Sequence, residues 1–400
     1  MNTIRIPQIL LPEDGLDMQK WAVNACDQYT SDSAYWKAVE ENTAGFKSAY
    51  NLIFPEIYLK DEPEKRISRI NQTMREYLSG GVFKKIEGGF ILVERTTAAG
   101  TRTGIVLCVD LEDYSYEKGT SALIRSTEAT ILERIPPRVQ IRQNAEVELP
   151  HVMLLYDDEE NSVLNCVERG KVLYDFELAY GGGHVKGTYI NNSNKVTSAL
   201  YALIESKRAI AKYGKDEKLL FAVGDGNHSL ATAKTCWEKL KPTLSKEQLE
   251  NHPARFALVE VVNVYDKALN FEPIHRLIKT DKEKLFSKNL KTSGGAVAYI
   301  VVDGKKHAVP FNSDVPAGIR ELDGYISDFI AQNGGEVDYI HGEDELKSFT
   351  YGKNVGVLLP AIAKDDFFRL IINGGNLPKK TFSMGEGNEK RYYIEAKKIR

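Results

Sequence analysis

The sequence predicts an α/β fold, with α+β as the alternative class, because helical and strand-like segments alternate along its 400 residues. Strand-like runs at 89–95 and 104–110 follow a mostly helical stretch at 15–80, and a short apolar run at 219–223 lies between two helical patterns. Hydrophobic residues make up 42% of the chain and charged residues 27%, as in globular proteins. We therefore expect mixed sheets covered by helices.

The strand-rich stretch extends from residue 81 to residue 175. Two apolar runs near its end, 153–156 and 163–167, lie on either side of the acidic residues 157–160 and predict a hairpin. Acidic residues are ligands that Mg²⁺ accepts, but a solvated turn is the commoner use of such a run.

The segment from 193 to 278 has the clearest pattern. One helix, ending near Gly214, is predicted by apolar residues close to a single face: Ala199, Leu203, Ile204, Ile210 and Ala211. After the 219–223 strand and a glycine-rich turn, a second helix is predicted by Leu230, Ala233, Trp237 and Leu240. Further along, a strand is expected at 298–302 and a helix near 317–333.

Three regions are expected from this order. They are an N-terminal mixed α/β region at 1–190, a strand–turn–helix region at 191–290 and a C-terminal α/β region at 291–400, packed around one shared cleft.

Charge and composition narrow the class of protein. The net charge of −3 argues against a dedicated nucleic-acid binder, which usually carries a basic surplus. No apolar run approaches the roughly 18 residues of a membrane span, and the first residues do not resemble a signal peptide. The four cysteines are far apart, so neither a zinc site nor a disulfide framework is expected. We expect a cytoplasmic protein with no nucleic-acid or membrane partner, and the oligomeric state is left open.

The turn Gly224-Asp225-Gly226-Asn227-His228-Ser229 is the first candidate site. The first N–H groups of a helix have no internal partner and attract anions, and the glycines let a ligand approach the backbone. Asp225 and His228 add an acceptor and a titratable base. The alternative is a capped helix start, in which Asn227 or Ser229 caps the helix and Asp225 interacts with its dipole.

A second candidate site lies in the stretch from Arg125 to Arg142. Pro136-Pro137 should end any preceding helix and begin the next. Arg138 and Arg142 then lie one turn apart on one face, a spacing that can hold a phosphate or carboxylate. The alternative is a solvated face that pairs with Glu146 and Glu148, and spacing alone does not separate the two.

Two glycine-rich segments carry weaker signals. The loop 180–187 offers His184 and Lys186 as phosphate ligands, although a plain connecting loop is the commoner use of three glycines. The tail 374–381 superficially has the pattern of a P-loop, but Lys379 replaces the second glycine and Pro378 removes a backbone donor, so a Walker site is rejected. Lys380 stays a candidate anion ligand.

With these residues identified, the sequence resembles, over nearly its whole length, the prokaryotic family known as domain of unknown function 1015. The hallmark of that family is an aspartate-glycine-histidine-histidine-arginine motif after a strand, as in ParB and sulfiredoxin relatives. Here the motif reads Asp225-Gly226-Asn227-His228-Ser229, so the first histidine and the arginine are replaced. Arg138, Arg142 or Lys380 could supply the missing cation. Other matching stretches are 25–30, 102–104, 127–130, 271–276 and 377–381.

The resemblance implies a ParB/sulfiredoxin-like core and phosphoryl transfer, because free-serine kinases with a ParB-like fold carry a similar motif. The implied enzyme is a kinase that forms O-phosphoserine from L-serine or a similar hydroxy amino acid, with ATP, ADP or pyrophosphate as donor and Mg²⁺ as cofactor. Glu128 is assigned as base, Asp225 as ligand of Mg²⁺ or substrate, and His228 as a catalytic phosphate contact. The expected further contacts are Arg102, Thr130, Arg134, Arg138, Arg142, His184, Gly226, Asn227, Ser229, His275, Arg276 and Lys380. The alternatives are a ParB-like nucleotide-dependent DNA-binding or regulatory protein and a phosphoserine hydrolase.

Overall fold

The computed structural model describes residues 2–86, 88–129 and 132–400, and it divides into two compact units. Unit 1 comprises Met1–Leu269 and Glu386–Arg400, and unit 2 comprises Asn270–Gly385. The expected boundaries at 190 and 290 do not coincide with this division. The α/β class is confirmed, since both units contain a sheet with helices.

Unit 1 is built on a ten-stranded mixed sheet of order β11-β12-β5-β6-β14-β10-β13-β8-β7, with β1 also paired to β6. Most neighbours are antiparallel, but β14 runs parallel to β10, and β8 runs parallel to β13 and β7. The strands are β1 (Ile4–Arg5), β5 (Phe90–Thr97), β6 (Gly100–Asp110), β7 (Tyr114–Ser115), β8 (Ile124–Arg125), β10 (Met153–Tyr156), β11 (Arg169–Leu178), β12 (Gly183–Ile190), β13 (Phe221–Asp225) and β14 (Phe256–Asn263).

Both faces of this sheet are covered, which explains why its central strands are continuously apolar. On one face, Leu92 and Leu107 belong to a core that includes residues of α6 (Ser193–Glu205) and α8 (Asn227–Leu240). On the other face, Val93 and Val106 pack with residues of β2 (Ile9–Pro12) and β21 (Tyr392–Tyr393). The C-terminal segment is therefore part of the core of unit 1.

A second core in unit 1 is formed around Trp21 and Trp36. It joins α1 (Met18–Trp21), α2 (Ser33–Thr43), the 3₁₀ turn η1 (Ala49–Leu52) and α3 (Pro63–Ser79). Other short elements of unit 1 are η2 (Glu56–Tyr58), η4 (Leu132–Arg134), α4 (Ile135–Arg142) and α9 (Lys246–Asn251). Three small sheets pair β2 with β4 (Phe83–Ile86), β3 (Val23–Asn24) with β21, and β9 (Val147–Glu148) with β22 (Lys397–Lys398).

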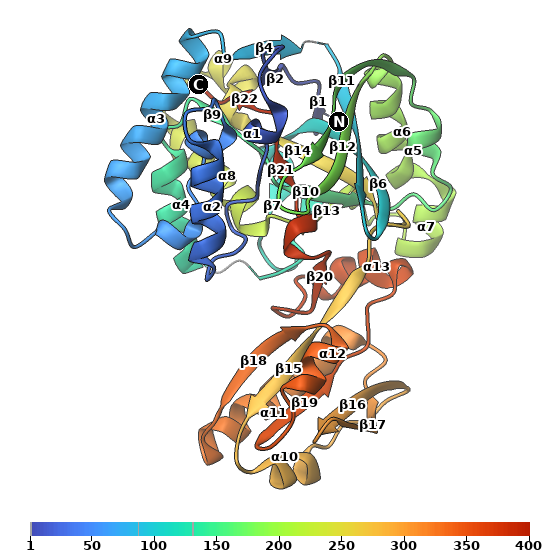
Figure 1. Ribbon diagram of the computed structural model, residues 1–400. Coiled ribbons are helices and arrows are strands. Elements are labelled where there is room, and N and C mark those ends of the chain that lie inside the picture. Colours follow the sequence, from blue (N-terminus) through green and yellow to red (C-terminus); the bar gives the residue numbers. More distant parts are fainter. Residues whose placement is uncertain (1, 87, 130–131) are drawn as a thin grey trace. The chain divides into compact units, whose positions relative to one another are not determined.

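Two expected elements of unit 1 are wrong. The single helix before Gly214 is two helices, α6 and α7 (Lys207–Tyr213), because Ser206 is extended (ψ 150°) and its side chain accepts a hydrogen bond from the N–H of Ala209 as an N-cap. The hairpin is absent, since β10 pairs with β13 and β14, and residues 162–165 form the short helix α5. Figure 1 shows α5, α6 and α7 together on one side of unit 1.

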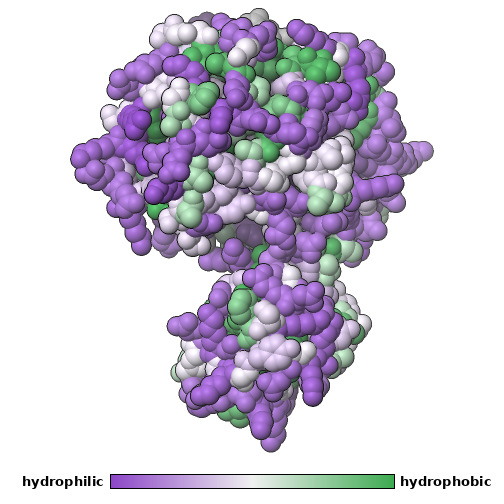
Figure 2. All heavy atoms as spheres, in the orientation of Figure 1, coloured by the Kyte–Doolittle hydropathy of each residue, from purple (hydrophilic) through white to green (hydrophobic). Residues whose placement is uncertain are grey.

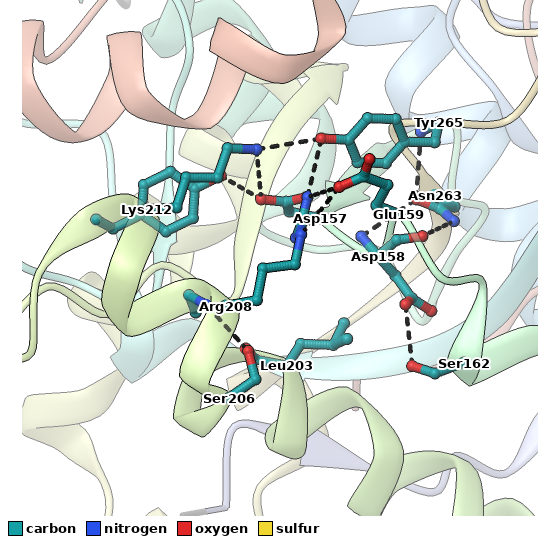
Figure 3. Close-up of polar contacts among 12 residues, drawn as sticks. Asp157, Asp158, Glu159, Ser162, Leu203, Ser206, Arg208, Lys212, Asn263 and Tyr265 are labelled. Atoms are coloured by element: carbon teal, nitrogen blue, oxygen red, sulfur yellow. Dashed lines mark hydrogen bonds and ion pairs between the residues drawn. The ribbon is translucent and has the colours of Figure 1, made fainter.

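Three of the acidic residues at 157–160, Asp157, Asp158 and Glu159, make polar contacts within unit 1 (Figure 3). Asp157 pairs with Arg208 at 3.0 Å and with Lys212 at 3.2 Å, which ties α7 to the end of β10. Asp158 accepts hydrogen bonds from the Ser162 hydroxyl and from the N–H of Val163, at the start of α5. Asp157 and Asp158 are thus used in contacts within unit 1, whereas Glu159 and Glu160 lie in an exposed turn, as the solvated-turn alternative expects.

Unit 2 is a six-stranded antiparallel sheet with helices. The sheet has the order β17-β16-β19-β15-β18, with β20 also paired to β15. Its strands are β15 (Phe271–Lys279), β16 (Ala296–Val302), β17 (Lys305–Phe311), β18 (Glu336–His341), β19 (Asn354–Leu358) and β20 (Phe382–Met384), and its helices are α10 (Glu283–Asn289), α11 (Val315–Asn333), α12 (Glu343–Ser348) and α13 (Lys364–Gly374). The strand expected at 298–302 and the helix expected near 317–333 are thus confirmed.

Hydrophilic residues cover most of the visible face of each unit in Figure 2, with apolar residues in scattered patches. Within the described part of the chain, no helix is both long and apolar enough to cross a bilayer.

Candidate functional site

The turn between β13 and α8 is shaped by Gly226. Its φ of +80° lies in the left-handed region, which favours glycine, and α8 begins at Asn227 without a side-chain cap. A Cβ atom at this position would lie 3.0 Å from Cα of Val152 and 3.5 Å from Cδ2 of His151. The turn therefore packs closely against residues 151 and 152. The capped-helix alternative is not what the structure shows, because neither Asn227 nor Ser229 caps α8.

The Asn227 side chain instead connects the turn to residues 126–128. Its Oδ1 atom lies 2.7 Å from the Ser126 hydroxyl and accepts the N–H of Thr127 at 3.2 Å. The Ser126 hydroxyl also lies 2.7 Å from the carbonyl oxygen of Glu128. Glu128, far from the motif in sequence, is thereby held beside the start of α8.

A cavity of about 140 Å³ opens beside the first turn of α8. It brings together polar residues from several separate segments of unit 1: Cys26, Asp27, Glu56, Arg138, Arg142, Glu148, His151, His228, Ser229, Thr232 and Tyr393. The rest of its lining is apolar: Leu52, Ile53, Phe54, Leu59, Met74, Ile141, Ala145, Val147 and Leu149. His228, Ser229, Arg138 and Arg142 thus share one cavity. The other residues predicted for this site, Glu128, Asp225, Gly226 and Asn227, are not among its lining residues, and all of these roles stay predictions.

Both arginines of α4 are paired with carboxylates. Arg138 forms an ion pair with Glu56, and Arg142 forms one with Glu148. Of the two acidic partners considered in the sequence analysis, Glu148 is therefore confirmed. Burial alone would raise the pKa of Glu148, but Arg142 and Lys397 outweigh it and lower that pKa. Burial raises the pKa of Glu56 despite its arginine partner. Each guanidinium therefore meets the cavity as half of an ion pair.

A chain of polar groups, in which His151 and Tyr393 are buried and Asp27 and Cys26 are partly exposed, lines the cavity, and sequence reasoning missed it. The Nδ1 atom of His151 lies 2.8 Å from the Tyr393 hydroxyl, and its Nε2 atom lies 3.5 Å from Oδ2 of Asp27. The Tyr393 hydroxyl also lies 3.1 Å from the sulfur of Cys26. Only Asp27 and Cys26 fall in a stretch that the sequence singles out, the family-like segment 25–30.

Burial and neighbouring charges act in opposite directions on the pair of Asp27 and His151. Burial would lower the pKa of His151, but the charges of Asp27, Asp225 and Glu56 outweigh it and raise that pKa. Burial would raise the pKa of Asp27, but His151 outweighs it and lowers that pKa. The two groups hold each other in their charged forms.

The Asp225 side chain contacts the glycine turn and the C-terminal segment. Its Oδ1 atom accepts the N–H of Gly226 at 2.9 Å, and its Oδ2 atom lies 3.2 Å from Nζ of Lys390. Among the described residues, no group of three His, Cys, Asp or Glu side chains could hold a metal ion. Asp225 is an ion-pair partner of Lys390 in this structure, and its role as a ligand of Mg²⁺ stays a prediction.

Three other predicted contacts in unit 1 are not among the residues that line the cavity. Arg102 on β6 lies 3.8 Å from Glu260, and His184 on β12 lies 2.8 Å from Asp175. Arg134 is exposed, and its carbonyl oxygen accepts a hydrogen bond from Arg138. The structure does not bring these three side chains to the proposed site. Thr130 lies outside the described residues.

The remaining predicted contacts, His275, Arg276 and Lys380, lie in unit 2. Arg276 is fully buried and donates to Asp323 at 2.8 and 3.0 Å and to the carbonyl oxygen of Lys380 at 2.9 Å. The Nδ1 atom of His275 accepts the N–H of Leu359, and burial lowers the pKa of His275 to about 4. Arg276 and His275 are therefore used in contacts within unit 2, whereas the sequence analysis expected them to contact the substrate.

Solved structures with similar folds share little sequence with this chain. A free serine kinase in complex with AMP has 11% identity and a TM-score of 0.38, covering 74% of this chain and 92% of that chain. The SbnI protein with C-terminal truncation from Staphylococcus aureus has 7% identity and a TM-score of 0.37 (70% and 82% covered), and a conserved hypothetical protein from Pyrococcus furiosus has 10% identity and a TM-score of 0.35 (70% and 90% covered). At these scores the likeness carries no argument about activity.

Among curated protein sequences, none matches the chain. The family comparison gives a match over almost the whole length. The model described as "Protein of unknown function (DUF1015)" matches residues 10–398, and the chain belongs to that family.

Proposed function

We propose that this protein is a small-molecule phosphotransferase that forms O-phosphoserine from free L-serine, with a nucleotide or pyrophosphate as donor. One observation carries the proposal: a small cavity of mixed charge lies at the N-terminal turn of α8, where His228 and Ser229 meet the two arginines of α4. The first turn of this 14-residue helix favours an anion through its dipole and through N–H groups that lack partners within the helix.

The charges of the cavity suit a zwitterion. Its lining includes three carboxylates, on Asp27, Glu56 and Glu148, together with guanidinium and imidazole groups. A polyanion alone would be repelled by the carboxylates, whereas an amino acid offers them an ammonium group and offers its own carboxylate to the cations. This balance favours an amino acid as the acceptor.

The size of the cavity points in the same direction. Its volume of about 140 Å³ is below the roughly 300–1,000 Å³ of pockets that enclose drug-sized ligands. This volume suits a ligand the size of L-serine better than a whole nucleotide. The donor would therefore reach the cavity with its terminal phosphate alone.

The proposed transfer uses three groups of this chain: the Glu128 carboxylate, the His228 imidazole and the first-turn N–H groups of α8. The serine hydroxyl attacks the terminal phosphorus of the donor, a new O–P bond forms, and the bond to the leaving phosphate breaks with the electron pair going to that phosphate. Glu128 accepts the hydroxyl proton. His228 and the first-turn N–H groups of α8 stabilise the negative charge of the transferred group.

Phosphorus NMR of the purified protein with L-serine tests the proposal, using ATP, ADP or pyrophosphate as donor, with and without Mg²⁺. A new O-phosphoserine signal with one of these donors is expected. Release of phosphate from O-phosphoserine without any donor would instead support the hydrolase alternative. Salt-sensitive DNA binding without either reaction would support the ParB-like alternative.

A pair of variants links the activity to the cavity. His228→Ala should lower the rate of O-phosphoserine formation at least about tenfold, because it removes a group proposed to face the transferred charge. His307→Ala changes an exposed histidine of unit 2 and should leave the rate unchanged. Equal rates in both variants would contradict the placement of the reaction in this cavity.

A further inference from the structure

Among the three carboxylates of the cavity, that of Asp27 is the most open. Its side chain is 26% exposed, compared with 16% for Glu56 and 5% for Glu148. Glu56 and Glu148 each form an ion pair with an arginine, whereas Asp27 has the imidazole of His151 at 3.5 Å and the amide of Gln28 at 3.1 Å. Asp27 therefore offers the carboxylate most accessible to a ligand.

The hydrogen bonds behind Asp27 are complete when His151 carries a positive charge. A tyrosine hydroxyl has one hydrogen and two lone pairs. The Tyr393 hydroxyl accepts the N–H of Cys26 at 3.2 Å, and with both ring nitrogens protonated it also accepts from Nδ1 of His151. Its own hydrogen is then free for the sulfur of Cys26 at 3.1 Å, and the protonated Nε2 of His151 forms an ion pair with Asp27 at 3.5 Å. If the His151 ring were neutral and accepted at Nδ1, the Tyr393 hydroxyl would donate its hydrogen to Nδ1, and none would be left for the sulfur of Cys26.

We propose that Asp27 binds the ammonium group of the substrate, and that His151 and Tyr393 are positioning residues that keep Asp27 ionised and in place. The choice of an amino acid as ligand rests on the proposed function. An ammonium group bound to a carboxylate at the edge of a small, partly apolar cavity forms a charge-assisted hydrogen bond, which is stronger than one between neutral groups. The inference thus names the chemical feature by which this cavity selects its ligand.

The titratable and charged groups around His151 and Asp27 come from several elements of unit 1. They are Cys26 and Asp27 after β3, Glu56 of η2, Asp225 at the end of β13, His228 of α8, and Lys390 and Tyr393 in the C-terminal segment, with Arg138 of α4 beyond Glu56. The carboxylates in this set outweigh burial and raise the pKa of His151, in agreement with a charged ring that donates toward both Tyr393 and Asp27.

Calorimetric titration with three compounds tests the role of Asp27: L-serine, ethanolamine, which lacks the carboxylate, and 3-hydroxypropanoate, which lacks the ammonium group. Asp27→Asn keeps the size of the side chain and removes its charge. It should weaken the binding of L-serine and ethanolamine about tenfold or more and change that of 3-hydroxypropanoate less than about twofold. Asp216→Asn, at an exposed loop position of unit 1, is the matched control and should bind all three as the wild-type protein does.

The positioning role has a separate readout in the pH dependence of L-serine binding. His151→Gln removes the charge that keeps the pKa of Asp27 low, so as the pH is lowered the affinity should begin to fall at a higher pH than in the wild-type protein. Tyr393→Phe removes only the hydroxyl and should shift the profile in the same direction by a smaller amount. An unchanged pH profile in a folded His151→Gln variant would overturn this role.

The outcomes separate this inference from the proposed function. Asp27-dependent binding of L-serine without O-phosphoserine formation from any donor would support the ammonium site and refute the kinase. O-Phosphoserine formation with unchanged L-serine affinity in Asp27→Asn would do the reverse. A wild-type protein that binds 3-hydroxypropanoate as tightly as L-serine, or that binds neither L-serine nor ethanolamine, would overturn the ammonium site.

Discussion

The turn that begins α8 depends on a glycine, and Gly226→Ala tests that dependence. The substitution adds one methyl group to a residue with φ of +80°. That methyl group would lie 3.0 Å from Cα of Val152 and 3.1 Å from its Cγ2 atom. Since the first of these is a backbone atom, the segment that leads into β10 would have to shift.

The cost has a conformational part and a packing part. Placing an alanine in the left-handed region costs about 1–2 kcal/mol, and about 0.4–1 kcal/mol is regained because alanine restricts the unfolded chain. Forcing a methyl group into a filled space costs about 1–3 kcal/mol more. Gly45 offers a matched control, because its φ is +78° and nothing lies within 4 Å of its added Cβ. We expect Gly226→Ala to lose about 1–3 kcal/mol more stability than Gly45→Ala.

Tryptophan fluorescence is a suitable assay, because all three tryptophans lie buried in unit 1: Trp21, Trp36 and Trp237. Urea unfolding followed by this signal reports on the unit that contains both glycines. Equal losses of unfolding free energy in the two variants would refute the claim that the turn is packed tightly against Val152.

Four further predictions concern the site. Glu128→Gln should keep fold and L-serine binding and lower the rate of O-phosphoserine formation about a hundredfold, measured by phosphorus NMR, and an unchanged rate would remove Glu128 as the base. Asp225→Asn should lower the same rate, because Lys390 loses its charged partner at the turn, and a wild-type rate would show that the pair is dispensable. Cys26→Ser should stay active, because burial raises the pKa of the thiol to about 12 and leaves no thiolate at neutral pH, whereas loss of activity would indicate thiol chemistry. The raised pKa of His151 adds stability that is full below about pH 6.5 and is lost as the pH rises through the folded pKa. The lowered pKa of Asp27 adds stability that is present above about pH 4 and is lost as the pH falls through the folded pKa. The urea midpoints of the wild-type protein should therefore be highest between these limits, and His151→Gln should flatten this dependence on pH.

Local sequence patterns predicted an element correctly where all of its signals lie within its own segment. The strand before the glycine turn and the helix after Gly226 follow from an apolar run, two glycines and a helical repeat, and the structure has β13 and α8 there. The same kind of pattern failed at Ser206, because a serine that caps its own helix interrupts a face that otherwise looks continuous. It failed again at 163–167, where a short apolar run with Val163 fully buried is a helical turn against the core. Runs of this length do not separate strand from helix.

The candidate site was predictable only where its residues share a segment. Arg138 and Arg142 are one helical turn apart, and His228 and Ser229 are adjacent, so spacing alone places each pair on one surface. Asp27, His151 and Tyr393 come from three separate segments, and only Asp27 falls in a stretch that the sequence singles out. Their proximity is a product of strand pairing such as that of β3 with β21, which a single sequence does not encode locally.

The C-terminal segment explains why this pairing matters for the site. Arg391 donates to Glu260 at 2.7 Å, to Glu395 at 2.8 Å and to the carbonyl oxygen of Pro150 at 2.7 Å, so a buried guanidinium joins β14, the tail and the residue before His151. A buried charge is tolerated when it is paired and hydrogen-bonded, so removing Arg391 would take a charged partner from the buried carboxylates of Glu260 and Glu395.

The same pairing fixes what lies on either side of Arg391. Lys390 reaches Asp225 at the motif, and Tyr393 reaches His151 behind Asp27. The turn at the motif and the cavity wall behind Asp27 are therefore both held by a segment that joins unit 1 only after the chain has passed through unit 2. Because the site is completed by these last residues, the motif at 225–229 can form its turn locally but cannot by itself assemble the charged wall that the proposed chemistry requires.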